Sequence, residues 1–151
     1  MYFVTATTWL FGAHAGLFYT SDRGATWKQV AQSANIGGLV HAPSGMYYLG
    51  SDQGVLESKD GQAWSLIPKS PPTIELLGNG KTLYAGDFLS ISGPTPNVIW
   101  SAPEDNPATW TRVTTPTMST LGGPWDLGYD ADHHVLYSAN KSSGLWRTVV
   151  P

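Results

Sequence analysis

Four side chains that can bind a ligand or move a proton recur along the chain: His14, Asp52, Asp87 and Asn140. Each follows a short apolar run that ends near a small residue. Two carboxylates placed across a glycosidic bond can act as its general acid and general base, so Asp52 and Asp87 are candidate catalytic residues. A short Asp side chain also caps tight turns, and this structural role is the alternative for both aspartates.

Aromatic side chains add to this candidate set. Trp125, with Asp126 beside it, and Phe88 adjoin two further apolar runs. A flat aromatic ring is a platform for a sugar ring, so Trp125, Asp126 and Phe88 are candidate ligand-binding residues together with His14 and Asn140. Phe88 also begins a long loop, 88–96, and long loops on a rigid scaffold commonly carry binding sites.

The densest group of potential metal ligands is the run Asp130-Ala131-Asp132-His133-His134. We expect an acidic turn followed by the start of a strand, where adjacent histidines point to opposite faces, and therefore no zinc site. A surface Ca²⁺ at the two aspartates stays open. The chain has no cysteine and no phosphate-binding loop, nucleophile elbow or His-Glu-x-x-His motif, so we expect no cofactor.

Composition excludes several other classes of function. The 151 residues suffice for one domain, and only 13% are charged, with a net charge of −3 and no basic block, so we expect no nucleic-acid partner. No apolar run is long enough to span a membrane, and the N-terminus lacks the features of a signal peptide. We expect a cytoplasmic protein if the chain is complete, and a secreted one if it is a fragment of a glycosidase.

A fourfold repeat must position the candidate residues. Each repeat contains up to four short apolar runs in chain order, which we assign to strands A to D. The A strands are expected at 2–4, 38–40, 74–77 and 125–128. The B strands are expected at 9–12, 47–50, 83–86 and 135–138. The C strands are expected at 16–21, 54–59, 97–102 and 144–149, and the D strands at 26–30, 63–67 and 109–113.

Repeats of about 40 residues with four short strands and no helical periodicity are typical of β-propeller blades. The sequence therefore predicts an all-β fold, a β-propeller of about four four-stranded antiparallel blades in one domain, 1–151. The approximate blade boundaries are 1–31, 35–68, 72–114 and 123–151. The last blade lacks its outer strand. In this arrangement the turns from B to C and the crossovers from D to A share one face of the propeller, where His14, Asp52, Asp87 and Asn140 are expected at equivalent positions.

The turn from C to D in the first repeat reads Thr20-Ser21-Asp22-Arg23-Gly24-Ala25-Thr26-Trp27. It resembles the Asp-box, or BNR repeat, of sialidases, xyloglucanase-type glycoside hydrolases and sortilin-like receptors. The second copy, 58–64, keeps Ser, Asp, Gly and Trp, and the third, 101–110, has a longer middle that contains Pro. The residues that match the motif, which we expect to be structural, are Ser21, Asp22, Gly24, Trp27, Ser58, Asp60, Gly61, Trp64 and Trp110.

The resemblance implies that these boxes lie on the face opposite the ligand site. It gives little support to sialidase chemistry, which needs three converging arginines, because Arg23, Arg112 and Arg147 fall in a turn and two strands that do not converge. Xyloglucanase-type enzymes use two opposed aspartates in a cleft between two propellers, which one chain of four blades cannot form.

Propellers close with four to eight blades, and the outer faces of the first and last blades must be covered. Three solutions stay open: two chains joined as an eight-bladed ring, upstream blades outside this sequence, or a compact four-bladed closure. For function, we expect a non-catalytic module that binds carbohydrate or protein. The alternatives are a glycoside hydrolase, sialidase-like or xyloglucanase-like, that is complete only as an oligomer or in a longer chain, and a purely structural half of a closed ring.

Overall fold

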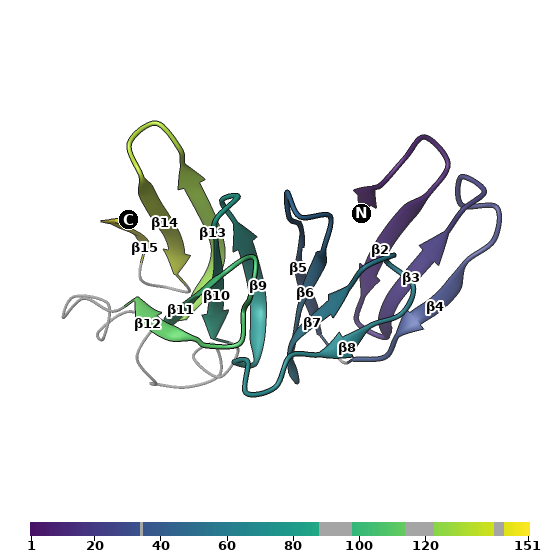
Figure 1. Ribbon diagram of the computed structural model, residues 1–151, viewed down its shortest axis with the longest axis horizontal. Coiled ribbons are helices and arrows are strands. Elements are labelled where there is room, and N and C mark those ends of the chain that lie inside the picture. The colour runs from purple at the N-terminus through teal and green to yellow at the C-terminus, as the bar shows by residue number, and fades with distance from the viewer. Residues whose placement is uncertain (34, 88–97, 114–122, 141–143) are drawn as a thin grey trace.

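The computed structural model describes residues 1–33, 35–87, 98–113, 123–140 and 144–151. These ranges contain β-strands and no helix, arranged as four sheets in a row (Figure 1). The first sheet holds β1 (Tyr2–Phe3), β2 (Trp9–Ala13), β3 (Gly16–Thr20) and β4 (Lys28–Ala31). The second holds β5 (Ile36–His41), β6 (Tyr47–Ser51), β7 (Gly54–Ser58) and β8 (Ser65–Leu66). The third holds β9 (Thr73–Gly78), β10 (Thr82–Asp87), β11 (Ile99–Pro103) and β12 (Thr111–Val113). The fourth holds β13 (Pro124–Asp130), β14 (Val135–Asn140) and β15 (Gly144–Val149).

Strand pairing confirms the predicted fold class. Every sheet pairs its strands in chain order and antiparallel, and the fourth sheet has three strands, as the sequence predicts. The outermost strands are shorter than expected. Trp27, Trp64 and Trp110 lie just before β4, β8 and β12 rather than inside them, because each tryptophan still belongs to the turn that precedes its strand.

The hydrophobic core lies between the sheets, not within any one of them. Three clusters of buried side chains fill the three spaces between neighbouring sheets. Leu17 and Leu49 belong to the cluster between the first two sheets, Val55 and Ala85 to the next, and Trp146 to the last. A twisted sheet with two apolar faces requires a neighbour on each side, and these clusters satisfy that requirement at three interfaces.

Small residues let the sheets approach one another closely. Gly12 on β2 faces the side chain of Ile36 at the start of β5, and a Cβ added to this glycine would lie 2.8 Å from Ile36 Cγ2. Likewise, a Cβ added to Gly86 on β10 would lie 2.7 Å from Pro124 Cγ at the start of β13. The closest approach joins β5 to β9, where a Cβ on Gly37 would lie 1.8 Å from the carbonyl oxygen of Ile74.

The turns from the third to the fourth strand are closed by aspartates. The Asp22 carboxylate accepts hydrogen bonds from the Thr20 hydroxyl at 2.6 Å, the Thr26 amide at 2.9 Å and the Thr26 hydroxyl at 2.6 Å. These bonds favour the ionised carboxylate and lower the pKa of Asp22 to about 2. Asp60 likewise accepts hydrogen bonds from the amides of Gln62 and Ala63, and its pKa is also lowered.

The third sheet closes the corresponding region differently. Glu104 is buried, and its carboxylate accepts a hydrogen bond from the amide of Gly80 at 2.8 Å. The hydroxyl of Tyr48 in the second sheet donates to the Glu104 carbonyl oxygen at 2.6 Å. Burial raises the pKa of Glu104. Glu104 and Tyr48 therefore add polar bonds to the apolar contact between the second and third sheets.

We predict that Gly37→Ala destabilises the chain by about 1–3 kcal/mol, the usual cost of overpacking, because the new methyl group would force β5 and β9 apart. Gly128→Ala is the matched control: Gly128 also lies on an innermost strand, but an added Cβ there would be 4.0 Å from its nearest neighbour, Tyr137 Cβ. Urea unfolding at one protein concentration measures both free energies of unfolding. Equal midpoints for the two variants would contradict the close approach of β5 and β9.

Candidate functional site

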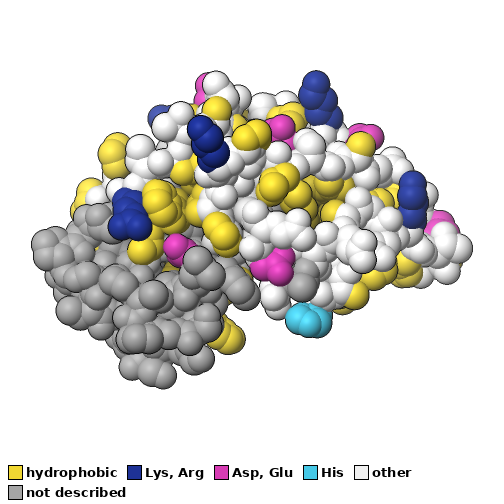
Figure 2. Space-filling view, turned by 90° about the horizontal axis from the view of Figure 1, so that it is seen from below, with side chains coloured by type: hydrophobic (Ala, Val, Ile, Leu, Met, Phe, Trp, Pro, Cys, Tyr) yellow, Lys and Arg dark blue, Asp and Glu magenta, His cyan; other side chains and the backbone are white. Residues whose placement is uncertain are grey.

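The end of the molecule that lies at the bottom of Figure 1 gathers the candidate residues. We call this end the lower face: it comprises the ends of β2, β6, β10 and β14, the turns that follow them, and the crossovers between sheets. Figure 2 looks directly at the lower face and shows acidic side chains near its middle. The turns closed by Asp22 and Asp60 lie at the opposite end of their strands.

All four recurring polar residues lie on the lower face, but they are not equivalent, which corrects the expectation from the sequence. His14 and Asp52 lie inside the turns after β2 and β6. Asp87 and Asn140 are instead the last residues of β10 and β14, and Asn140 pairs with Gly144 as Ser51 pairs with Gly54. His14 and Asp52 therefore lie one residue further along the strand register than Asp87 and Asn140. The two pairs of side chains leave the sheets at different points.

Local hydrogen bonds fix the side chains of Asp52 and Asn140. The Asp52 carboxylate accepts a hydrogen bond from the Ser33 hydroxyl at 2.5 Å, which ties the β6–β7 turn to the crossover from the first sheet. The Asn140 amide donates to the carbonyl oxygens of Ser138 and Gly144 at 3.0 and 3.2 Å. Asp87 is half-buried. His14 is the exposed member of the four, and the Asp87 amide also donates to the Val98 carbonyl oxygen at 3.0 Å.

Trp125 and Asp126 lie at the start of β13, and both side chains are exposed. Phe88 lies outside the described residues. The sequence analysis missed Glu75, which lies opposite Gly86 on the innermost strand of the third sheet. Burial, and next the negative charge of Asp126, raise the pKa of Glu75 to about 7. A carboxyl group that stays protonated near neutral pH can donate a proton to a leaving group.

A pocket of about 530 Å³ opens between the third sheet and the crossover that joins it to the second sheet. The crossover that leads into β9 forms one wall, and the third sheet forms the other. The lining residues are Lys69, Ser70, Pro71, Pro72, Asp87, Trp100, Ala108, Thr109 and Trp110. Two indole rings, one carboxylate and one ammonium group give the pocket apolar walls with a few polar contacts, the usual make-up of a small-ligand site.

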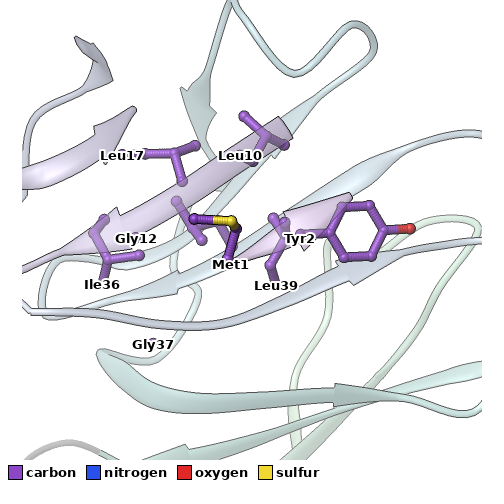
Figure 3. Close-up of a pocket in the computed structure, with 9 residues that line it drawn as sticks. Met1, Tyr2, Leu10, Gly12, Leu17, Ile36, Gly37 and Leu39 are labelled. Carbon is purple, nitrogen blue, oxygen red and sulfur yellow. The ribbon is translucent and has the colours of Figure 1, made fainter. Parts of the chain in front are cut away.

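A second hollow, between the first two sheets, is not a candidate functional site. It measures about 230 Å³, and Figure 3 shows Leu10, Leu17, Ile36 and Leu39 around it, with Met1 in its middle. None of the side chains that line it is charged. The hollow is a gap in the packing of the two sheets, and we assign it no ligand.

The Asp130–His134 run covers the last residue of β13 and the β13–β14 turn, so both histidines lie in the turn and not, as expected, at the start of a strand. The Asp130 carboxylate accepts hydrogen bonds from the amides of Asp132 and His133 at 3.0 and 3.2 Å, and it lies 2.8 Å from the His133 ring. These bonds lower the pKa of Asp130. Within the described ranges, no three His, Asp or Glu side chains are grouped so as to hold a metal ion, and no helix is long and apolar enough to cross a membrane.

Comparison with solved structures identifies the architecture. An ancestral GH74 enzyme superposes with a TM-score of 0.74 over 96% of this chain, at 15% identity. The GH74 enzyme of Niastella koreensis superposes with a TM-score of 0.62 over 95% of this chain, at 16% identity. YCF48 bound to D1 peptide superposes with a TM-score of 0.64 over 97% of this chain, at 17% identity. The chain is a β-propeller. No family model and no curated protein sequence matches it.

The propeller neighbours are much larger than this chain. The matched region spans 21% of the ancestral GH74 enzyme, 28% of the Niastella koreensis enzyme and 48% of YCF48. At these identities the likeness shows the fold alone. The residues on the lower face must therefore carry any argument about function.

We predict that the side-chain carboxyl of Glu75 titrates near pH 7 and that Asp126→Asn lowers its pKa, because the substitution removes a nearby negative charge. The carboxyl ¹³C shift followed by NMR measures both values. Since the pKa of Glu75 is raised by folding, the stability of the chain falls as pH rises from about 4.5 to about 7, and Glu75→Gln abolishes that part of the pH dependence. A Glu75 pKa near 4.5 would contradict its burial.

Proposed function

We propose that the chain is a non-catalytic propeller module that binds its ligand on the lower face. The observation that carries this proposal is the pocket beside the third sheet, which extends from Lys69 and Asp87 on the lower face along the sheet to Trp110 in the β11–β12 turn. His14, Trp125 and Asp126 extend the same face outside the pocket, and Asp52 and Asn140 hold the turns beneath them.

A carbohydrate is the ligand that this pocket fits best. Sugars offer an apolar ring face for indole contacts and hydroxyl groups for a carboxylate, and both kinds of partner line the pocket. The resemblance to GH74 enzymes is consistent with a carbohydrate. A protein ligand is the competing outcome, because YCF48, whose propeller is also similar, is bound to a D1 peptide.

We further propose that the turns closed by Asp22 and Asp60 are Asp-boxes with a purely structural role. Both carboxylates accept bonds from their own turn, and the Trp64 indole donates to the Gly61 carbonyl oxygen at 2.9 Å. Gly24 and Gly61 have φ values of 85° and 73°, which a side chain would strain. These contacts account for the Asp and Gly positions without a ligand. The hydroxyl of the motif comes from Ser58 in the second turn but from Thr20, not the expected Ser21, in the first.

We predict that Asp87→Asn weakens carbohydrate binding about tenfold to a hundredfold, because hydrogen bonds to a charged group contribute about 1.5–3 kcal/mol. Glycan arrays identify a binding oligosaccharide, and calorimetry with that oligosaccharide measures the Kd. Asp132→Asn, in the exposed β13–β14 turn at the other end of the molecule, is the control and should bind as the parent does. A peptide array run in parallel tests the competing ligand class. Binding that survives Asp52→Ala and Asp87→Ala combined would remove the proposal.

A second candidate function, glycoside hydrolysis, is favoured by one observation. Burial and then the charge of Asp126 raise the pKa of Glu75 to about 7, so Glu75 is partly protonated at neutral pH, and the exposed Asp126 supplies the second carboxyl group of the pair. In this alternative Glu75 and Asp126 replace Asp52 and Asp87 as the reactive pair. Asp52 is the weaker candidate because its carboxylate already holds the Ser33 hydroxyl.

For this alternative we predict that Glu75→Gln lowers turnover of aryl glycosides by about 10²–10⁴-fold, the usual contribution of a general acid. Asp52→Asn should leave turnover within a few fold of the parent chain. When the parent chain acts on an aryl glycoside whose leaving group needs no protonation, the pH profile of kcat should have no alkaline limb, because that substrate does not need the general acid. Turnover that is unchanged in Glu75→Gln would exclude Glu75 as the acid, and no turnover by the parent chain leaves binding as the function.

A further inference from the structure

The three contacts between neighbouring sheets follow one rule. We call the side of a sheet that faces the next sheet in the chain its forward face, and the side that faces the previous sheet its backward face. Leu17, Val55 and Ile99 occupy one position on the forward faces of the first three sheets, opposite Gly12, Gly50 and Gly86. All three side chains are at most 1% exposed, because the next sheet covers them.

The forward face of the fourth sheet breaks this rule. Leu145 lies opposite Ala139, the register position that corresponds to Leu17, yet it is 71% exposed. Val149 on the same strand is also exposed, and Tyr137 and Arg147 pair across the same face. The forward face of the fourth sheet therefore carries the apolar surface of an interface but has no described sheet against it.

The backward face of the first sheet breaks the rule in the same way. Phe11 corresponds in register to Leu49 and Ala85, which are at most 1% exposed, whereas Phe11 is 42% exposed. Its ring lies 6.2 Å from that of Trp27, and the ring of exposed Phe3 lies 5.3 Å from that of Trp9. An aromatic surface of this extent is unusual on a side of a sheet that meets only water.

The two uncovered faces complement each other. Inside the chain, a forward-face residue meets a backward-face residue: Leu17 shares a core cluster with Leu49, and Val55 shares one with Ala85. By register, the equivalent positions on the two uncovered faces are Leu145 and Phe11.

Shape and charge agree with this pairing. The forward face of the fourth sheet has a hollow of about 620 Å³ between Val135, Tyr137 and Val149, near the start of β14. Trp9 is the first residue of β2 and pairs with Phe3 of β1, at the corresponding end of the first sheet. Arg147 lines the same hollow, and an arginine over an aromatic ring is already present in the chain, with Arg112 5.0 Å from the Trp100 ring centre.

We propose that two copies of the chain close an eight-sheet ring, in which the forward face of the fourth sheet of each copy packs on the backward face of the first sheet of the other. The first and fourth sheets stand at opposite ends of the row in Figure 1, so one copy does not cover its own ends. A twofold axis makes the two new contacts identical and leaves no face uncovered. Eight sheets lie within the usual range for propellers.

Disulfide trapping tests this pairing directly, because the chain has no cysteine of its own. One preparation carries Phe11→Cys and a second carries Leu145→Cys, both at exposed positions whose substitution leaves the interior intact. After mixing and mild oxidation, we expect a cross-linked species of twice the 16.2 kDa chain mass. Neither preparation alone should cross-link, and Ser44→Cys, in the exposed β5–β6 turn, should not cross-link with either partner.

Light scattering supplies an independent readout. The parent chain should have the mass of a dimer, and Leu145→Asp should have the mass of a monomer with an unchanged circular dichroism spectrum. Cross-linking of Phe11→Cys with itself would show that like faces pair and would overturn the proposal. A monomeric parent chain, or open polymers in place of a closed dimer, would overturn it as well.

Discussion

Close packing of one sheet upon the next is the interaction on which the rest of the structure depends. Each sheet is apolar on both sides, and a two-sided sheet is stable only when both sides are covered. Gly12, Gly50 and Gly86 allow the first residue of each following sheet to fit against the second strand of the sheet before it. This contact fixes the direction in which each second strand ends. It therefore determines where the turns and crossovers of the lower face come together.

Most of the fold was predictable from the sequence, because strand period and turn residues are local signals. The order of strands, their antiparallel pairing and the missing outer strand of the fourth sheet were all predicted. The start of the outermost strands was misplaced, since a tryptophan favours a strand in isolation, whereas Trp64 is bonded to Gly61 within the preceding turn. Local propensity gives no information on such a bond.

The candidate site was less predictable, because it depends on register and burial. Repeat spacing alone aligned Asp87 with Asp52, but pairing places Asp87 within its strand and Asp52 beyond the end of its own. Glu75 was missed for a related reason. A single Glu in an apolar strand suggests an exposed position, and only the neighbouring sheet reveals that Glu75 is half-buried near the charge of Asp126. The sequence held one signal of an unusual environment for Glu75: β9 contains no Lys or Arg that could pair with its carboxylate.

The small residue on the second strand also has a geometric consequence. Because that position sets how near the next sheet can come, its side-chain volume governs the wedge angle between modules. A glycine there allows a tight wedge, and a bulkier residue would widen it, so this position contributes to the curvature of the array together with the close approach at Gly37. Substitution at this position offers a simple route by which related arrays could acquire different numbers of modules.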